Sequence, residues 1–554
     1  MHVSLARTLA LIAPLVLAGT PVAGLAQQGR PDVSGRTAAV VAGHPLAAAA
    51  GADVLRRGGN AVDAAITMAA VLAVVRPHMN GVGADNFMLI RDAQSRAVHA
   101  LNGSGRAGSR ATPALFQGRG LDDIPSSGVL SVSVPGAVRG WEDALRRFGT
   151  IPLADALAPA IRLAEDGFPV STRLSLDIDA ERRRLARDTA MARTFLVNGR
   201  APEPGMLLRQ PDLARTLRTI AEGGADAYYG GAPGRAIADF MVREEGLVTL
   251  EDLRDHRSTW TQPIETTYHG LRVLAFPPNT QGIAVLELLN IGEVFDLKAM
   301  GHNSAAYLHT LVNATRLAYE DRDAHVADPE FANVPVDRLA SKDHARARAR
   351  LIRPMDVVRP RLEPDRDGSG DTIFLCVVDA QGNAVSMIQS LFSSFGSGRM
   401  VPGTGIVLHN RGSLFSLDAS HPNLVAPRKR PYHTLSPAMV LRADGALHAV
   451  LGSPGGDGQP QTIAQVLNNV VLFGMTPQQA VEAPRWRASG TSRLSVEPGV
   501  ADSVRTALAA AGHEVRVSEP GAEFGGAQMI LVHPLTRMLM TGADPRREAY
   551  GIAW

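Results

Sequence analysis

Apolar residues recur with the period of a helix through much of the first part of the chain. This pattern predicts a helical stretch over residues 47–75, broken at the Gly-Gly-Asn motif of residues 58–60, because glycine and asparagine favour a turn. The same period predicts further helices over residues 138–148, 153–166, 213–223 and 305–319. The first part of the chain is therefore expected to be mostly helical, with strands between the helices.

The pattern changes after residue 370, where short apolar runs of strand length replace the helical period. Residues 373–379 and 384–390 flank an Ala-Gln-Gly-Asn turn, so they predict a hairpin that brings Ser390 back beside Thr372. Residues 438–442 and 447–451 predict a second hairpin in the same way. Further strands are expected at residues 493–497, 514–518, 529–532 and 538–540, and helices at residues 461–473 and 502–511.

A polar segment over residues 354–370 separates the two parts. It is rich in Pro, Arg, Asp and Gly and has no apolar period, so it predicts an exposed connector that ends just before Asp371-Thr372. Such a connector suits a cleavage site.

Composition indicates a globular protein without a nucleic-acid partner. The chain has 554 residues, of which 45% are apolar and 20% charged, and its net charge is only +2. A chain of this length and composition can bury a large core. The basic clusters at residues 182–184 and 428–430 are short and lack interleaved aromatic residues, so we expect solvated faces or contacts with single anions there.

The first 26 residues resemble a signal peptide. Arg7 closes a short positive region, residues 9–17 are mostly apolar, and Gly-Leu-Ala at residues 24–26 predicts cleavage after Ala26. We expect a periplasmic or secreted protein that no longer contacts the membrane once the signal is removed. The one cysteine, Cys376, lies in a predicted strand, so it forms no intramolecular disulfide and is expected to be a small buried hydrophobe.

Thr372 is the strongest candidate for a catalytic residue. A threonine at the start of a strand becomes a nucleophile with its own base if the bond before it is cut, because the freed α-amino group has a pKa of about 7.7–8. The structural alternative is a β-branched residue that simply begins a strand. Only the surrounding motifs decide between the two.

Other catalytic and metal signatures are absent from the sequence. It contains no G-x-S-x-G, H-E-x-x-H or G-x-x-x-x-G-K-[ST] motif and no cysteine cluster. His302 and His309, and the group Asp321, Asp323 and Asp328, match no common metal-binding spacing. We therefore expect no metal and no cofactor.

The ordered motifs of the mature chain resemble the γ-glutamyltransferase (glutathione hydrolase) family of N-terminal-nucleophile hydrolases. The motifs that carry the resemblance are His-Pro-Leu at 44–46, residues 58–65, Val-Pro-Gly-Ala at 134–137, residues 278–282, Asp-Thr at 371–372, Asp379 with residues 382–385, Phe-Gly-Ser-Gly at 395–398, Lys-Arg-Pro at 429–431, Ser-Pro at 436–437, residues 452–456 and Ala-Asp-Pro-Arg at 543–546. The resemblance implies an α+β fold, a four-layer αββα sandwich. It also implies self-cleavage between Asp371 and Thr372 into a large subunit, residues 27–371, and a small subunit, residues 372–554.

The resemblance assigns roles to five positions. Thr372 would attack the substrate amide and carry the acyl group. Ser390 stands where the family has a second threonine and would orient the Thr372 hydroxyl. Gly455 and Gly456 would present backbone N–H groups to the oxyanion, which glycine allows without a Cβ clash. Arg106 would bind the substrate α-carboxylate through its planar guanidinium.

The sequence departs from the glutathione-cleaving pattern at the residues expected to bind the acyl group. Phe392 replaces an Asn, while Arg411 and Leu414 replace the Gln and Asp that hold the substrate α-ammonium. His433 and Thr434 replace two serines. These changes remove an anion from the acyl site and add a cation.

We therefore expect an exported, self-processing amidohydrolase that hydrolyses a small-molecule amide, with transfer of the acyl group to amino acids or peptides as an alternative to hydrolysis. γ-Glutamyl compounds, glutathione above all, are the default family substrates. One alternative is an acylase for a dicarboxylic half-amide without an α-amino group, of oxamate or glutaryl type. A second alternative is a non-catalytic periplasmic solute-binding protein, which would stay one chain on a denaturing gel.

Overall fold

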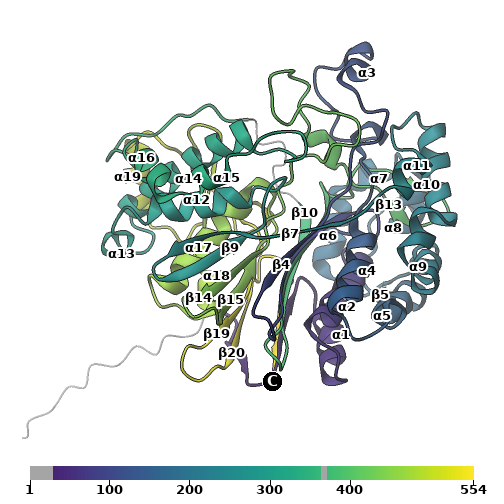
Figure 1. The fold of residues 1–554 in the computed structure, drawn as a ribbon, viewed down its shortest axis with the longest axis horizontal. Coiled ribbons are helices and arrows are strands. Elements are labelled where there is room, and N and C mark those ends of the chain that lie inside the picture. Colours follow the sequence, from purple (N-terminus) through teal and green to yellow (C-terminus); the bar gives the residue numbers. More distant parts are fainter. Residues whose placement is uncertain (1–28, 364–370) are drawn as a thin grey trace, which may run out of the picture.

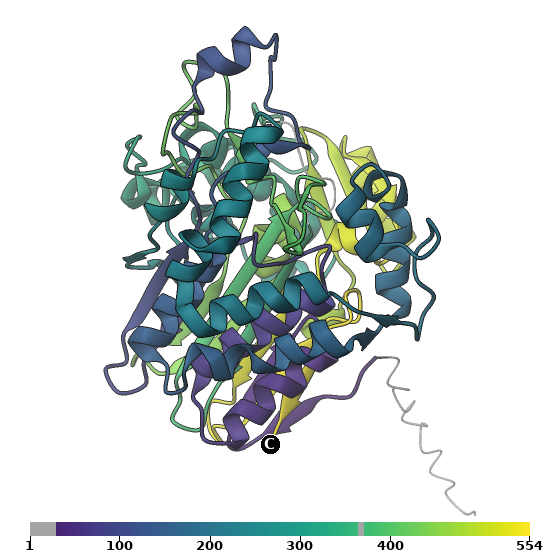
Figure 2. The ribbon, with the colours of Figure 1, turned by 90° about the vertical axis from the view of Figure 1, so that its right-hand side faces the viewer.

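Two large β-sheets face each other, and helices cover the outer face of each sheet (Figure 1). The computed structural model describes residues 29–363 and 371–554, so the predicted signal peptide and the last part of the connector lie outside the described residues. Figure 2, turned by 90°, shows the helices that lie across one of the two outer faces. The expected four-layer αββα sandwich is confirmed.

The first sheet contains the strand that begins at the predicted cleavage site. All its strand pairs are antiparallel. Its strand order is β21 (Tyr550–Ala553), β2 (Ala39–Ala42), β10 (Asp371–Val378), β11 (Ala384–Phe392), β3 (Asp85–Arg91), β4 (Val98–Gly103) and β7 (Thr259–Thr261). The predicted β10–β11 hairpin lies at the centre of this sheet, and β2 and β3, which precede the predicted cleavage site in the chain, flank it on its two sides.

The second sheet has the same number of strands and is also antiparallel throughout. Its strand order is β1 (Val33–Gly35), β20 (Leu539–Ala543), β19 (Gln528–Val532), β15 (Leu447–Gly452), β14 (Ala438–Arg442), β9 (Leu271–Ala275) and β8 (Ile264–Tyr268). The predicted hairpin of β14 and β15 is confirmed.

Strand β10 is buried on both faces, which explains its continuous apolar sequence. Phe374 and Cys376 point into the core between the two sheets. Ile373 and Leu375 point to the other side, into the core beneath the helices. Cys376 is a free, fully buried thiol, as expected, and burial raises its pKa well above the ordinary value.

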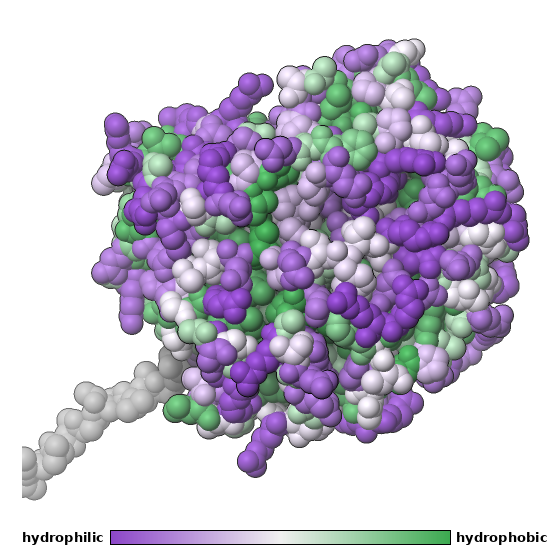
Figure 3. All heavy atoms as spheres, in the orientation of Figure 1, coloured by the Kyte–Doolittle hydropathy of each residue, from purple (hydrophilic) through white to green (hydrophobic). Residues whose placement is uncertain are grey.

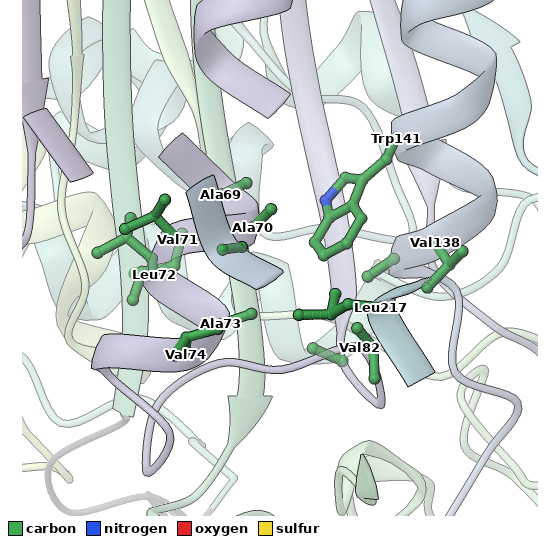
Figure 4. Close-up of a cluster of buried hydrophobic side chains, with 14 of the residues drawn as sticks. Ala69, Ala70, Val71, Leu72, Ala73, Val74, Val82, Val138, Trp141 and Leu217 are labelled. Carbon is green, nitrogen blue, oxygen red and sulfur yellow. The ribbon is translucent and has the colours of Figure 1, made fainter. Parts of the chain in front are cut away.

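The helices over the first sheet are α1 (Pro45–Arg56), α2 (Ala61–Val75), α4 (Ala137–Phe148), α5 (Leu153–Asp166) and α9 (Pro211–Tyr229). Every residue of α2 is buried, because this helix lies between the sheet and the outer helices. Figure 4 shows α2 residues such as Val71 and Leu72 in the same core as Trp141 of α4. Asn60 caps α2, and Asp379, just after β10, accepts the Ala61 N–H at 3.0 Å.

The helices over the second sheet include α12 (Gly282–Gly292), α14 (Ala305–His325), α17 (Gln459–Val471) and α18 (Pro477–Glu482). Polar and charged residues cover most of the face seen in Figure 3. In the part of the chain that the structure describes, no helix is long and apolar enough to cross a bilayer.

Smaller elements complete the fold. They are α3 (Pro113–Gly118), η1 (Val129–Ser131), β5 (Phe168–Pro169), α6 (Thr172–Ala180), α7 (Arg182–Leu185), α8 (Thr189–Phe195), β6 (Leu207–Leu208), α10 (Ala232–Arg243), α11 (Leu250–Arg254), α13 (Leu297–Met300), α15 (Val336–Leu339), α16 (Lys342–Ala349), β12 (Met400–Val401), β13 (Ile406–Val407), η2 (Arg411–Leu414), η3 (Gly456–Gly458), β16 (Trp486–Ser489), β17 (Arg493–Val496), α19 (Asp502–Ala510), β18 (Glu514–Val517) and η4 (Ala522–Phe524). The basic segments 182–184 and 428–430 are solvated in part, as expected, since Arg182, Arg183 and Arg428 are exposed. Other residues of these segments make structural contacts. Arg184 donates to backbone carbonyls of Ser394 and Gly396, and Lys429 donates to carbonyls of nearby loop residues.

Candidate active site

The predicted cleavage site lies in a β-bulge at the start of β10. Asp371 pairs with Phe392, and the next pair is Ile373 with Gln389, so two residues of β11 lie opposite Thr372 alone. A bulge of this kind bends the strand and redirects side chains. Asp371 is only 9% exposed and Thr372 only 1% exposed. The connector was expected to expose the cleavage site, but the scissile bond itself is buried because it already belongs to the central strand.

One hydroxyl group joins the predicted nucleophile to the bond that it would cleave. The Ser390 hydroxyl donates to the carbonyl oxygen of Asp371 at 2.9 Å. It accepts hydrogen bonds from Thr372 Oγ1 at 3.1 Å and from the Phe392 N–H at 2.7 Å. A serine hydroxyl has one proton and two lone pairs, so all three bonds can form together. Ser390 therefore bonds both the Asp371 carbonyl and the Thr372 hydroxyl, and its place beside Thr372 is the one that the hairpin predicted.

The side chain of Asp371 has its own partner, Arg547, near the C-terminal end of the chain. Its carboxylate oxygen lies 2.9 Å from Arg547 Nη1, and both side chains are largely buried. This ion pair fixes the residue on the amino side of the scissile bond.

Three predicted acyl-site residues lie together beside this bulge. Phe392 has a left-handed backbone (φ 81°), and the Arg411 guanidinium lies 4.3 Å from the centre of its ring. Arg411 is fully buried and donates from Nη1 to Thr434 Oγ1 at 3.0 Å. The structure thus brings Phe392, Arg411 and Thr434 into one cluster, which the Phe392 N–H links to Ser390.

The Gly455-Gly456 loop lies at the same end of the sandwich. Phe374 of β10 packs under Gly452 at the end of β15, and the loop continues from there in the direction of Thr372. Gly455 and Gly456 both have positive φ, which glycine adopts without strain. Gln281 Nε2 donates to the carbonyls of Thr434 at 2.7 Å and Gly456 at 3.0 Å.

Gln281 therefore ties the glycine loop to the acyl-site cluster. Arg322 in turn holds Gln281 in place. Its Nη1 donates to Gln281 Oε1 at 2.9 Å and to Asp457 at 3.0 Å. Neither Gln281 nor Arg322 was predicted as a site residue.

Asp85 is a further residue that the sequence analysis missed. It lies directly opposite Ser390 in the β3–β11 pair, so the two side chains share a face of the sheet. One carboxylate oxygen accepts the N–H groups of Gly105 and Gly136 at 3.0 Å each, and the other lies 3.1 Å from His433 Nε2. The signal in the sequence was an acidic residue at the start of an apolar run. The pairing itself left no local signal, because the partner His433 is 348 residues away.

The charge state of this pair follows from its burial. Burial alone would raise the pKa of the Asp85 carboxyl, but His409, His433 and a backbone N–H together hold it below its usual range. Burial and the nearby Arg411 lower the pKa of His433 to about 3. His433 is therefore neutral at neutral pH, with its proton on Nε2 facing the Asp85 carboxylate.

Two predicted residues lie apart from the cluster. Arg106 lines a hollow of about 310 Å³ and is ion-paired with Glu330, 2.6 Å from its Nη2. Its predicted role would require the substrate carboxylate to replace Glu330, so this role stays a prediction. Leu414 lines a smaller hollow together with Tyr432 and Asp457, the residue that follows Gly456.

One group of potential metal ligands exists in the described part of the chain. Glu287, Asp321 and His344 lie close together, with His344 Nε2 2.9 Å from Asp321. Arg348 Nε lies 2.7 Å from the same Asp321 oxygen, and burial raises the pKa of Glu287 well above its usual range. These contacts pair Asp321 with His344 and Arg348, and burial favours the neutral form of Glu287.

Comparison with known proteins identifies the family. Residues 47–554 match the family described as Gamma-glutamyltranspeptidase. The chain is 39% identical over 527 residues to the glutathione hydrolase-like YwrD proenzyme of Bacillus subtilis (strain 168), covering 94% of this chain and 99% of that protein. It is 38% identical over 518 residues to the oxamate amidohydrolase proenzyme of Klebsiella pneumoniae, covering 91% and 96% of the two chains.

A solved structure gives the same result. The crystal structure of cephalosporin acylase from Bacillus halodurans matches with a TM-score of 0.90 and 36% identity, over 98% of this chain and 99% of that one. Because these relatives are enzymes, the alternative of a solute-binding protein is set aside. The chain belongs to the gamma-glutamyltranspeptidase family of N-terminal nucleophile hydrolases, whose proenzymes include amidohydrolases and acylases.

Proposed function

We propose that this protein is exported, cleaves itself between Asp371 and Thr372, and then hydrolyses small amides whose acyl group carries a carboxylate but no α-ammonium. The observation that carries the substrate class is the buried Arg411, which lies on Phe392 and donates to Thr434 next to Ser390. γ-Glutamyl compounds remain the second candidate, because relatives are glutathione hydrolases.

Self-cleavage uses groups already in place. Thr372 Oγ1 attacks the carbonyl carbon of Asp371, and its proton passes to the departing nitrogen as the C–N bond breaks. The shift frees the Thr372 amine and leaves an ester between Asp371 and the Thr372 side chain. Water hydrolyses this ester, which gives a new α-carboxylate on Asp371 and restores the Thr372 hydroxyl. Burial of both residues supports an intramolecular reaction, because an external protease needs access to the bond.

The two fragments would remain one enzyme. In the first sheet, β10 of the small subunit pairs with β2 of the large subunit, and β11 pairs with β3. Separating the subunits would break both ladders and expose the core strand β10. We therefore expect two bands on a denaturing gel and a single species by gel filtration.

Turnover would follow the same path with the substrate amide in place of the scissile bond. The Thr372 amine takes the proton of its own hydroxyl, which attacks the substrate carbonyl carbon. The C–N bond then breaks, the protonated amine gives the proton to the leaving nitrogen, and the acyl group stays on Thr372 as an ester. Gly455 and Gly456 donate N–H groups to the oxyanion, and Ser390 holds the nucleophile. Water then releases the acid.

The charge of the acyl site determines the preferred substrate. Leu414 stands where relatives that bind an ammonium need an acid, and Arg411 adds a buried positive charge. Asp85 is the acidic side chain on the same face as Ser390, but two N–H groups and His433 already occupy its oxygens. Bringing an ammonium beside a buried guanidinium is unfavourable, because the two charges have the same sign. A carboxylate at that point is stabilised.

The test compares two anilides that differ in one group. Glutaryl-p-nitroanilide and γ-glutamyl-p-nitroanilide share the leaving group and the terminal carboxylate, and only the second has an α-ammonium. We expect a higher kcat/KM for the glutaryl compound, and oxamate tests whether a shorter acyl group is accepted. Efficient γ-glutamyl hydrolysis with slow glutaryl hydrolysis would refute the proposed substrate class while leaving the family chemistry intact.

Export is tested separately. The purified large subunit should begin at Gln27. A version of the protein that lacks residues 1–26 should remain in the cytoplasm. A mature protein that retains residues 1–26 would contradict this part of the proposal.

A further inference from the structure

Another hollow lies at the opposite end of the two sheets from Thr372. Strand β10 runs from the scissile bond to Val378, and Val378 and Asp379 line this hollow of about 380 Å³. Seven steps at a rise of about 3.3 Å place Val378 roughly 23 Å from the bulge. The volume falls in the range of about 300–1,000 Å³ that is usual for small-molecule sites.

Arginines from distant parts of the chain converge on this hollow. Arg36, Arg91, Arg96 and Arg537 line it, and they come from the turn after β1, from β3 and its following turn, and from the turn between β19 and β20. Within residues 29–363 and 371–554, no carboxylate forms an ion pair with any of these four side chains. The whole chain is nearly balanced in charge, with 56 Lys and Arg against 54 Asp and Glu. The hollow therefore gathers four guanidinium groups whose charges no ion pair within the described residues compensates.

The carboxylates at this end of the molecule are used to shape turns. Both oxygens of Asp379 accept N–H groups, from its own turn and from the start of α2. Asp444 accepts a backbone N–H within the β14–β15 turn, and Asp92 accepts N–H and O–H groups within the β3–β4 turn. These acids reduce the local positive charge, but their oxygens are directed at the turns.

Two backbone carbonyls hold the side chain of Arg91 at the hollow. It is 6% exposed, and its guanidinium donates to the carbonyls of Gly382 at 2.9 Å and Gly445 at 3.4 Å. Its Nε has no hydrogen-bond partner in the described chain. Burial, followed by the positive charges of Arg96 and Arg537, lowers the pKa of Arg91. An anion placed between these side chains would relieve that repulsion.

We propose that this hollow, which we call the arginine hollow, binds a small multivalent oxyanion that carries phosphate or carboxylate groups. Planar guanidinium groups suit both kinds of oxyanion, since each presents parallel N–H donors to two oxygens. One buried arginine and three exposed ones can neutralise more than one negative charge. The site is separate from the acyl site and does not depend on the proposed substrate.

The experiment is calorimetric titration of the processed enzyme with pyrophosphate and with citrate, and with acetate as a monovalent comparison. The test variant is Arg96→Gln/Arg537→Gln, which removes two exposed charges at the hollow and keeps the fixed Arg91. The matched control is Arg57→Gln/Arg162→Gln, because these two exposed arginines line another hollow of similar volume, about 370 Å³. Amide hydrolysis by each variant shows that it is folded.

We expect saturable binding of pyrophosphate, citrate or both, much weaker binding of acetate, and affinity that falls as salt concentration rises. The test variant should bind at least about tenfold more weakly, while the control variant should bind as the unmodified protein does. Binding of pyrophosphate alone would define a phosphate site, and binding of citrate alone a carboxylate site.

Two results would overturn the proposal. The first is an absence of saturable binding of either anion to the unmodified protein at millimolar concentration. The second is that the test variant and the control variant lose the same affinity, or that neither of them loses any. Binding that persists in the test variant and is displaced by glutarate would assign the anion to the acyl site instead.

Discussion

Replacing Ser390 by alanine tests the centre of the proposed chemistry. This change removes the donor to the Asp371 carbonyl, the acceptor for the Thr372 hydroxyl and the acceptor for the Phe392 N–H. Loss of one donor to a reacting carbonyl typically costs about 10²–10³ in rate. We expect self-cleavage and amide hydrolysis each to slow by about 10²-fold, which corresponds to about 2.7 kcal/mol of activation free energy.

The variant should still fold. The buried Phe392 N–H loses its acceptor, which costs about 1–3 kcal/mol, and a domain typically has about 5–15 kcal/mol of stability. The matched control is Ser386→Ala. Ser386 lies on the same face of β11, is fully buried and makes only a 3.4 Å hydrogen bond to the Leu451 carbonyl. It therefore tests the loss of a buried hydroxyl in this strand away from the bulge.

The assay follows the uncleaved chain on denaturing gels after a short expression pulse, and then anilide hydrolysis by the processed protein. Ser390→Thr should recover most of both rates, since it keeps the hydroxyl. Equal rates for Ser390→Ala and Ser386→Ala would remove Ser390 from the mechanism and refute the interpretation of its three hydrogen bonds.

Three further predictions address the nucleophile, the acyl site and pH. Thr372→Ala should stay one chain without amidase activity, and mass spectrometry of the unmodified small subunit should find Thr372 at its N-terminus; complete cleavage of the variant would assign the cut to another agent. Arg411→Gln/Leu414→Asp should raise kcat/KM for γ-glutamyl-p-nitroanilide relative to the glutaryl compound, because it removes a cation and adds an anion; a shift the other way would place ammonium binding elsewhere. Burial lowers the pKa of His433 and His256 to about 3, so both are neutral in the fold, whereas in the unfolded chain they gain protons below about pH 6.5. Their contribution to stability is therefore complete above pH 6.5 and lost as the pH falls toward 3, and Tm measured from pH 8 to pH 4 should decrease below pH 6.5; a constant or rising Tm in that interval would contradict this.

Local patterns predicted most elements because each depends on neighbouring residues. The helical period gave α5 with the bounds that the structure shows, and the break at residues 58–60 separates α1 from α2. The turn between β10 and β11 fixed the register of that hairpin, so it also predicted the contact between Thr372 and Ser390. The bulge beside Thr372 could not be predicted, because it depends on how Phe392 and Asp371 pair within the complete sheet.

The sequence by itself determined the family, and it predicted the nucleophile and the hairpin that places Ser390 beside it, since these are encoded in short ordered motifs. Only the tertiary structure decided what surrounds them. Asp85 meets His433, and Arg411 meets Phe392 and Thr434, because two sheets and their connecting loops bring distant segments to one end of the sandwich. The physical reason is that burial and charge pairing are set by long-range packing, which no local period specifies.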